Sequence, residues 1–310
     1  MSPVTALGHA KINLALGVGP LRADGFHELD TIFQSLDIHD RVTVTPVDGP
    51  PGVRRLTVAG LGADAVPTDR TNLAWRAAEL VLGDLTGVPA VDIHIEKGIP
   101  TAGGMAGGSA DAAAALRATA EVLRVVTGTG SSEAQLLEHA RALGSDVPFT
   151  LLGGTRRGTG RGELLEEIPA TRTRHWALAF NRRGLSTPEV FRTLDAMRVG
   201  AGCVASGDTS ELLAALLADA GPEEIAPLLS NDLGAPALRL SPGLAEILRV
   251  GESAGALAGI VSGSGPTCGF LCADAVTARE VAGAVAGACC DIRMTATATG
   301  PAPGAQLVPR

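Results

Sequence analysis

A glycine-rich segment in the first half of the chain constrains the fold more than any other feature. Four glycines fall within six residues, and a serine follows them: Gly103, Gly104, Met105, Ala106, Gly107, Gly108 and Ser109. Alternating apolar and polar residues at 91–96 predict a strand before this segment, and an alanine- and leucine-rich stretch at 109–126 predicts a helix after it. Glycines at such a turn let backbone N–H groups surround an anion at the positive helix N-terminus. The segment therefore predicts a phosphate-binding loop.

Other common phosphate-binding motifs do not describe this segment. Ser109 stands where a Walker A loop has lysine, and the chain contains no G-x-G-x-x-G dinucleotide fingerprint. The alternative that stays open is a glycine-rich turn that only permits close packing.

Composition excludes several classes of protein. A net charge of −8 without a basic run argues against nucleic acid as a partner. Hydrophobic residues make up 45% of 310 residues, enough for two compact domains. No apolar stretch reaches the roughly 18 residues that span a bilayer, and no basic leader is present, so we expect a cytoplasmic protein without membrane contact. The five cysteines show neither a disulfide framework nor a zinc spacing, which fits reduced thiols.

Lysine is rare in this chain. Of 25 basic residues, only Lys11 and Lys97 are lysines. A lysine ammonium is more compact than a guanidinium, which matters beside a phosphate or a reacting hydroxyl. Both lysines are therefore candidate functional residues, and Lys11 shares one face of a predicted strand with Asn13.

A single acid follows the predicted helix 131–143. Asp146 lies in the sequence Gly-Ser-Asp-Val-Pro at 144–148. An aspartate at such a break commonly caps the next helix. If Asp146 instead faces the phosphate loop beside Lys11, its carboxylate can accept a proton from an attacking hydroxyl, as phosphoryl transfer requires. The sequence leaves both roles open.

Two further segments suggest ligand contacts. Phe26 and His27 follow a turn at 22–25, where a phenyl ring can stack on a nucleobase and an imidazole can bind its edge. A core phenylalanine and a structural histidine are the alternative. Gly263 and Ser264 lie in a run of small residues, which predicts either a β-turn or a second wall of the anion site.

The predicted elements alternate between strands and helices. We expect strands at 4–18, 41–45, 55–59, 91–96, 175–180, 258–272 and 291–299, and helices at 72–82, 109–126, 131–143, 188–197, 210–220, 222–229, 242–253 and 276–286. Thr71 or Asp69 is the expected N-cap of the first helix. A glycine- and arginine-rich loop at 153–162 marks a domain boundary. The domains are then 1–158 and 159–300, followed by a flexible tail at 301–310.

These motifs, in this order, resemble the GHMP kinase superfamily. The resemblance rests on an N-terminal lysine strand, a Gly-Gly-x-x-Gly-Gly-Ser loop that opens a helix, and a late Gly-Ser-Gly segment. The matching segments are 10–14, 22–27, 72–73, 97–100, 103–109, 143–148 and 262–266, from one end of the chain to the other. The Asp-Gly-aromatic-His element at 24–27 resembles the branch that acts on a cytidine-diphosphate-linked methylerythritol.

The resemblance implies a two-domain α+β fold. The N-terminal domain is expected to have a β-α-β architecture like that of ribosomal protein S5, and the C-terminal domain to be ferredoxin-like, with the active site in the cleft between them. The implied reaction is ATP-dependent phosphorylation of the substrate's 2-hydroxyl, in the non-mevalonate route to isoprenoids. ATP and Mg²⁺ are the implied cofactors, a small molecule carrying cytidine diphosphate is the partner, and the protein is expected to be a monomer or homodimer.

The resemblance also assigns roles to residues. Asp146 is the implied general base, and Lys11 polarises the hydroxyl that attacks. The implied nucleotide-binding residues are Asn72, Lys97, Pro100, Gly103, Gly104, Met105, Ala106, Gly107, Gly108 and Ser109. The implied substrate-binding residues are Asn13, Phe26, His27, Asp146, Gly263 and Ser264. The family commonly has tyrosine at position 26, so base stacking is expected here without a phenol hydrogen bond. No metal ligand is evident.

Two other functions compete with this interpretation. A homoserine or mevalonate kinase of the same superfamily would share the phosphate loop, but its acceptor has no base for Phe26 and His27. A catalytically inactive sensor on the same fold would bind ATP without turnover, which the presence of Lys11, Asp146 and Ser109 disfavours.

Overall fold

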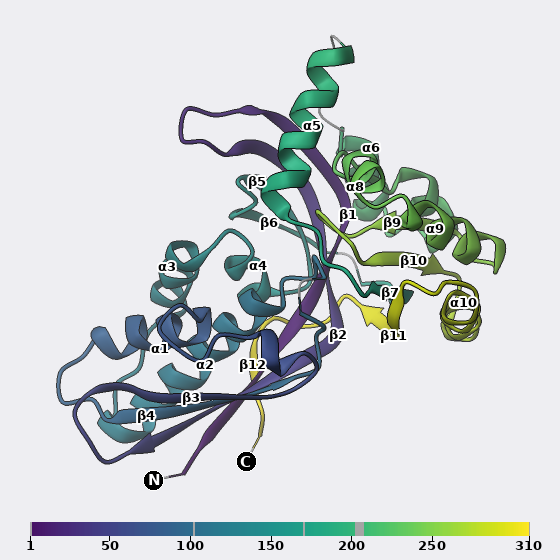
Figure 1. Cartoon of the computed structure of the whole chain (residues 1–310). Helices are drawn as coiled ribbons and strands as arrows, with labels where there is room; N and C mark the ends of the chain where they lie inside the picture. The colour runs from purple at the N-terminus through teal and green to yellow at the C-terminus, as the bar shows by residue number, and fades with distance from the viewer. Residues whose placement is uncertain (1, 102, 170, 202–207, 310) are drawn as a thin grey trace.

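A long antiparallel hairpin organises the molecule. A computed structural model describes residues 2–101, 103–169, 171–201 and 208–309. In it, β1 (Val4–Leu21) and β2 (His27–Val47) pair along nearly their whole length and run from one end of the molecule to the other (Figure 1). Residues 8–19 are buried without interruption, because protein covers both faces of this strand.

The hairpin belongs to an eight-stranded sheet. Its central order is β12-β1-β2-β4-β3, with β5 paired to β2 and β6, and β8 paired to β1. The strands besides the hairpin are β3 (Gly52–Gly60), β4 (Ala90–Lys97), β5 (Thr155–Gly160), β6 (Leu164–Ile168), β8 (Ser230–Asn231) and β12 (Gln306–Leu307). β3 and β4 are parallel and joined through α1, which is the expected β-α-β unit.

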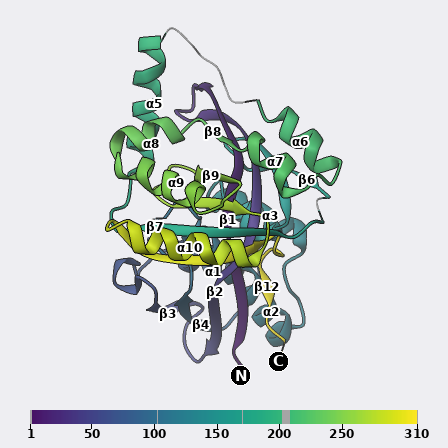
Figure 2. The same cartoon turned by 90° about the vertical axis from the view of Figure 1, so that its right-hand side faces the viewer.

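A second sheet contains four antiparallel strands in the order β11-β7-β10-β9. Its strands are β7 (Arg174–Asn181), β9 (Ala258–Val261), β10 (Cys268–Cys272) and β11 (Ile292–Gly300). With helices after β7 and between β10 and β11, this order is that of a ferredoxin-like domain, as expected. Figure 2 shows α10 lying across this sheet.

The helices fall into two groups on either side of the hairpin (Figure 1). The first group contains η1 (Ala63–Ala65), α1 (Leu73–Gly83), α2 (Gly107–Thr127), α3 (Glu133–Leu143) and α4 (Val147–Leu152). The second contains α5 (Thr187–Ala201), α6 (Ser210–Leu217), α7 (Pro222–Ile225), η2 (Ala226–Leu228), α8 (Gly234–Leu240), α9 (Gly243–Ser253) and α10 (Ala275–Ala288). None of the helices in the described ranges is both long and apolar enough to cross a membrane.

Separate apolar cores hold these layers together. The helices α1 to α4 bury their apolar faces on β1, β2 and β4, around residues such as Val42 and Ile93. A second core joins the hairpin to the four-stranded sheet, through Ile12 and Leu14 on one side and Trp176 and Leu178 on the other. Both cores are built mainly from alanine and branched aliphatic residues, as expected for a chain with 3% aromatic residues.

Several predicted boundaries shift in the structure. The helix predicted at 131–143 is α3, which begins with a capping box formed by Ser132 and Gln135. The cap of α1 is neither Thr71 nor Asp69 but Asn72, because the Asp69 carboxylate accepts hydrogen bonds from Thr71 instead. The strand predicted at 258–272 is two strands, β9 and β10, joined by a turn.

The loop predicted at 153–162 is wrong, because most of it is strand β5, which pairs with β2 and β6. Gly158 belongs to this strand, and a Cβ there would lie 2.7 Å from the Phe33 ring, so glycine permits close packing rather than a turn. The boundary expected at residue 158 falls inside β5. We propose that the domains divide after β6 instead.

The flexible tail predicted at 301–310 is also wrong for its described part. β12 pairs with β1, and Ala302 and Ala305 are buried. The Ala302 N–H donates to the Ser35 carbonyl oxygen at 3.0 Å. The final segment is therefore an integral part of the first domain.

Four cysteines are free thiols, and Cys203 lies outside the described residues.

Candidate active site

Two cavities meet at the predicted phosphate loop. The large cavity, about 660 Å³, lies between the hairpin, α5 and the start of α2 and α4. The loop cavity, about 360 Å³, lies on the other side of the glycine-rich segment. Gly104 and Ala106 line both cavities. A ligand in one cavity can therefore reach a ligand in the other across this loop.

The predicted nucleotide-binding residues gather around the loop cavity. Its lining includes Asn72, Lys97, Pro100, Gly103, Gly104, Met105, Ala106, Gly107 and Gly108, while Ser109 lines the large cavity. Asn72 uses its amide to cap α1, with its oxygen accepting from the Ala74 N–H at 2.8 Å. The four glycines of the loop therefore line a cavity that an anion could occupy.

The backbone of the loop prepares the N-terminus of α2. Ala106 precedes the helix with φ 57°, a left-handed conformation that non-glycine residues rarely adopt. The first N–H groups of an α-helix, here those of Gly107, Gly108 and Ser109, have no partner within the helix. Together with the helix dipole they favour a negatively charged group at this end.

A turn from the second domain, at residues 261–267, packs against the glycine-rich loop. Gly104 has φ +73°, and a Cβ there would lie 2.5 Å from the Ser262 carbonyl oxygen. The Ser262 hydroxyl donates to the Gly104 carbonyl oxygen at 3.3 Å. Gly263 and Ser264, predicted as a second wall, line the large cavity directly. The run of small residues at 261–267 therefore contacts the loop instead of serving only as a β-turn.

Lys97 forms a buried ion cluster beneath the loop. Its ammonium donates to Asp40 and, at 2.7 Å, to Asp111. Asp40 also accepts from the N–H groups of Gly98 and Ile99 at 2.7 and 2.8 Å. Burial and the negative charge of Asp40 raise the pKa of Asp111 well above its ordinary value, against the effect of Lys97. Burial alone would lower the pKa of Lys97, but the charges of Asp111 and Asp40 raise it.

Lys11 and Asn13 point from β1 into the large cavity. The Lys11 ammonium donates to the Asn13 side-chain oxygen at 2.7 Å, and the Asn13 amide nitrogen donates to the Thr31 hydroxyl at 2.8 Å. Thr31 in turn donates to the Ala15 carbonyl oxygen at 2.6 Å. This chain of hydrogen bonds fixes which side of the Asn13 amide faces Lys11. A Cβ on Gly263 would lie only 3.4 Å from the Lys11 nitrogen.

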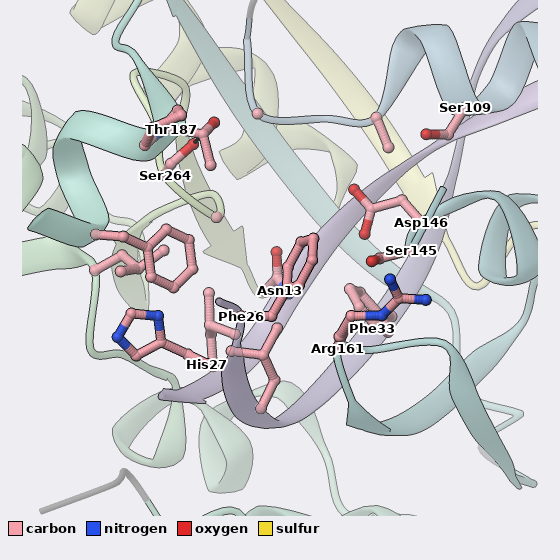
Figure 3. Close-up of a pocket in the computed structure, with 18 of the residues that line it drawn as sticks. Asn13, Phe26, His27, Phe33, Ser109, Ser145, Asp146, Arg161, Thr187 and Ser264 are labelled. Carbon is pink, nitrogen blue, oxygen red and sulfur yellow. Dashed lines mark hydrogen bonds between the residues drawn. The ribbon is translucent and has the colours of Figure 1, made fainter. Parts of the chain in front are cut away.

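Asp146 lines the same cavity as Lys11 and Ser109. It occupies the position before α4, but its side chain makes no capping hydrogen bond. The capping alternative is therefore excluded, and Figure 3 shows the carboxylate beside Ser109 and Ser145, facing the cavity. In the described part of the chain, Asp146 and Lys11 form no ion pair within 4.0 Å. The two side chains instead line the wall of the same cavity beside the loop.

Phe26 and His27 line the same cavity as Asp146, and in Figure 3 His27 lies on the far side from Asp146, with Phe26 between them. Phe26 is 50% exposed, so it is not the core residue of the alternative interpretation. Its ring lies 5.1 Å from the Arg161 guanidinium. His27 is buried, and its ring stacks on Phe191 with 5.1 Å between the ring centres. The His27 Nε2 lies 2.9 Å from an Asp195 carboxylate oxygen.

Several residues of the site were missed by the sequence analysis. Phe191, Arg192 and Asp195 come from α5, and Arg161 from the turn after β5. Asp40 and Asp111 form the cluster beneath the loop. The sequence offered one signal, the rarity of aromatic residues: the chain has six phenylalanines and no tyrosine. Three of the six, including Phe191, line the large cavity.

The described residues contain no group of three or more histidine, cysteine, aspartate or glutamate side chains that could hold a metal ion. One buried Asp111 oxygen has no hydrogen-bond partner, but the Lys97 ammonium on the other oxygen makes that position unsuitable for a cation. The Ser109 hydroxyl and the Asp146 carboxylate line the large cavity at the loop. These two oxygen donors fit a Mg²⁺ ion held chiefly by phosphates.

Comparison with known proteins agrees with this geometry. The family model "GHMP kinases N terminal domain" matches residues 72–154, and "GHMP kinases C terminal" matches residues 212–290. The chain is 52% identical to the 4-diphosphocytidyl-2-C-methyl-D-erythritol kinase of Corynebacterium diphtheriae, over 98% of this chain and 97% of that protein. It is 51% identical to the kinase of the same name from Nocardia farcinica, over 99% and 97%.

Solved structures give the same result. A crystal structure of 4-(cytidine 5′-diphospho)-2C-methyl-D-erythritol kinase matches with a TM-score of 0.76 and 31% identity, covering 96% of this chain and 99% of that one. Homoserine kinase from Cytophaga hutchinsonii matches with a TM-score of 0.73 but only 17% identity, covering 99% and 98%, which shows a shared fold alone. The chain belongs to the 4-diphosphocytidyl-2-C-methyl-D-erythritol kinase family of the GHMP kinases.

Proposed function

We propose that this protein transfers the γ-phosphoryl group of ATP to the 2-hydroxyl of 4-diphosphocytidyl-2-C-methyl-D-erythritol. The products are the 2-phosphate and ADP, in the non-mevalonate route to isoprenoids. One observation carries the proposal: two cavities of suitable size meet at the phosphate loop, and the larger is lined by Lys11 and Asp146 at that junction. The high identity to relatives of this name supports the choice of substrate.

ATP fits the loop cavity. Its base and ribose would lie near Asn72, Lys97 and Pro100, and its triphosphate along Gly103–Ser109 with the γ-phosphate turned toward the large cavity. The free N–H groups at the start of α2 would bind phosphate oxygens. Lys97 acts here mainly by holding β4 and α2 together, because its ammonium is committed to two carboxylates.

The acceptor fits the large cavity with its base at one end and its 2-hydroxyl at the other. Phe26 would stack on the cytosine, and His27 would bind its edge. Asn13, Gly263 and Ser264 would position the methylerythritol beside the loop. Arg161 and Arg192, which also line this cavity, would neutralise the diphosphate.

The reaction would follow from these positions. Asp146 accepts the proton of the 2-hydroxyl, and Lys11 stabilises the oxygen that develops negative charge. A bond forms between this oxygen and the γ-phosphorus, while the bond from the γ-phosphorus to the bridging oxygen of ADP breaks. The loop N–H groups stabilise the charge on the phosphoryl oxygens. Most of the rate acceleration then comes from positioning and electrostatics.

A Mg²⁺ ion that binds with ATP would be held by phosphate oxygens and by the Ser109 hydroxyl, with Asp146 nearby. It would neutralise charge on the triphosphate when bound.

A coupled assay of ADP release tests the proposal. The purified protein receives ATP with 4-diphosphocytidyl-2-C-methyl-D-erythritol, homoserine or mevalonate as acceptor. We expect ADP release only with the first, and a new phosphomonoester by ³¹P NMR. Release with homoserine or mevalonate instead would assign the protein to another GHMP activity. Nucleotide binding without release on any acceptor would indicate a sensor.

A further inference from the structure

Asp195 contacts the predicted base-binding histidine from a helix that the sequence analysis did not connect to the site. It lies two helical turns into α5, and its carboxylate oxygen is 2.9 Å from His27 Nε2. An ionised carboxylate only accepts hydrogen bonds. The hydrogen of this contact therefore belongs to Nε2 of His27.

The second nitrogen of the ring then becomes the one that a ligand meets. Among the described residues, His27 Nδ1 has no hydrogen-bond partner. It is also not one of the fully buried polar atoms that lack a partner, so a ligand can reach it. His27 lines the large cavity, and stacking on Phe191 restricts rotation of its ring. In a neutral imidazole whose Nε2 carries the hydrogen, Nδ1 is an acceptor.

We propose that Asp195 fixes the tautomer of His27 and thereby makes the cavity select cytosine over uracil. This inference rests on the proposed function, because it concerns the base of that substrate. Cytosine presents an exocyclic amino group, which donates to an acceptor. Uracil presents a carbonyl oxygen at the same position, and its lone pairs would face those of Nδ1. A site whose acceptor finds no donor rejects the analogue strongly.

Asp195 is a positioning residue in this scheme, since it acts through His27. Its side chain is 45% exposed, so replacing it leaves the cores of the protein intact. In Asp195→Asn, the uncharged amide can donate to Nε2 as well as accept from it, so the ring hydrogen is no longer held on Nε2 and the preference for cytosine weakens. Glu189→Gln is a matched control, because it makes the same acid-to-amide change on α5 at a residue outside the cavity lining.

The first test measures the tautomer without substrate. The protein is labelled with ¹⁵N-histidine, and the His27 signals are assigned by their loss in His27→Gln. We expect a bare nitrogen at Nδ1 and an N–H at Nε2 in the wild type and in Glu189→Gln, and a substantial fraction of the opposite tautomer in Asp195→Asn. An N–H at both positions, or at Nδ1 alone, in the wild type would overturn the proposal.

The second test measures base selection with cytidine- and uridine-diphosphate-linked substrates. We expect Asp195→Asn to reduce the ratio of kcat/KM values for the two bases about tenfold or more, mainly through KM for the cytidine substrate. Asp195→Glu should restore part of the ratio, and KM for ATP should not change. An unchanged ratio in Asp195→Asn contradicts the inference, whereas a wild type inactive on the cytidine substrate contradicts the proposed function itself.

Discussion

Burial of two carboxylates beside one ammonium makes the Asp40–Lys97–Asp111 cluster sensitive to pH. The pKa of Asp111 is raised from 3.8 by burial and by Asp40. As the pH rises, Asp111 therefore loses its carboxyl proton near pH 3.8 in the unfolded chain, but only at a higher pH in the folded protein. The contribution of Asp111 to stability is largest in acid and falls as the pH rises toward its folded pKa.

Asp111→Asn removes this dependence. We expect the free energy of unfolding of the wild type, relative to Asp111→Asn, to fall as the pH rises above about 4. Urea unfolding of both proteins at a series of pH values measures the difference, in which titrating groups away from this cluster cancel. A difference that stays constant would show that the pKa of Asp111 is unshifted, and a difference that increases with pH would show that folding lowers this pKa; either result contradicts the prediction.

Phe26 provides an exposed aromatic face in the wall of the large cavity. We expect Phe26→Ala to raise KM for the cytidyl substrate about fivefold or more, because stacking on a base is worth about 1–3 kcal/mol. Steady-state kinetics should show little change in KM for ATP, and Phe26→Tyr should retain the wild-type KM. A Phe26→Ala variant with unaltered KM for the cytidyl substrate would remove Phe26 from the base pocket.

For single residues, the sequence analysis selected side chains that the structure places around the two cavities. Lys11, Asp146, Phe26 and the loop glycines stand out by rarity or by local motif, and all of them line the two cavities. Asp195 has no such signal. It reaches His27 across 168 positions of the chain, and only the packing of α5 beside the hairpin reveals the contact.

Among the elements, the phosphate loop depends on its contact with the turn at 261–267. A methyl group at Gly104 would meet the Ser262 carbonyl oxygen, and the positive φ of this residue adds strain. We expect Gly104→Ala to raise KM for ATP and lower kcat, with kcat/KM for ATP reduced more than tenfold. Gly283→Ala on α10, where a Cβ meets nothing within 4 Å, should behave as wild type. Similar kinetics for the two variants would argue against this role of the loop contact.

The C-terminal segment contributes to stability through the first sheet. Backbone bonds of 2.9–3.0 Å join Gly154 to Ala302, Ala302 to Ser35, Ala305 to Thr150 and Val308 to Thr5. We expect truncation after Gly300 to lower the free energy of unfolding by about 4 kcal/mol, since each such bond contributes about 1 kcal/mol. Truncation after Val308 is the control and should have little effect. Thermal or urea unfolding gives the values, and equal stability of the two truncations would contradict an integral role.

Local patterns predicted most helices and the exposed, alternating strands. The first half of β2 was missed because residues 31–36 are buried on both faces, so no alternation marks them. β5 was missed because its glycines resemble a loop, and β12 because a two-residue strand has no periodicity. Such segments are specified by their neighbours in the fold.

At the scale of the whole molecule, the site exists only because the two domains meet. The hairpin, α2 and α4 supply Lys11, Ser109 and Asp146, while the second domain supplies α5 and the turn at 261–267. The order of motifs along the chain was sufficient to predict both domains and the cleft between them. The boundary expected at residue 158 falls inside β5, which pairs with β2 in the first sheet.

The central claim is that Asp146 takes the proton of the substrate hydroxyl at the junction of the two cavities. Asp146→Asn keeps the size of the side chain but removes the base. The decisive measurement is single-turnover phosphoryl transfer by this variant, with ATP affinity measured on the same sample. We predict a rate reduced at least 100-fold with nearly unchanged ATP affinity. A rate close to that of the wild type would contradict the account.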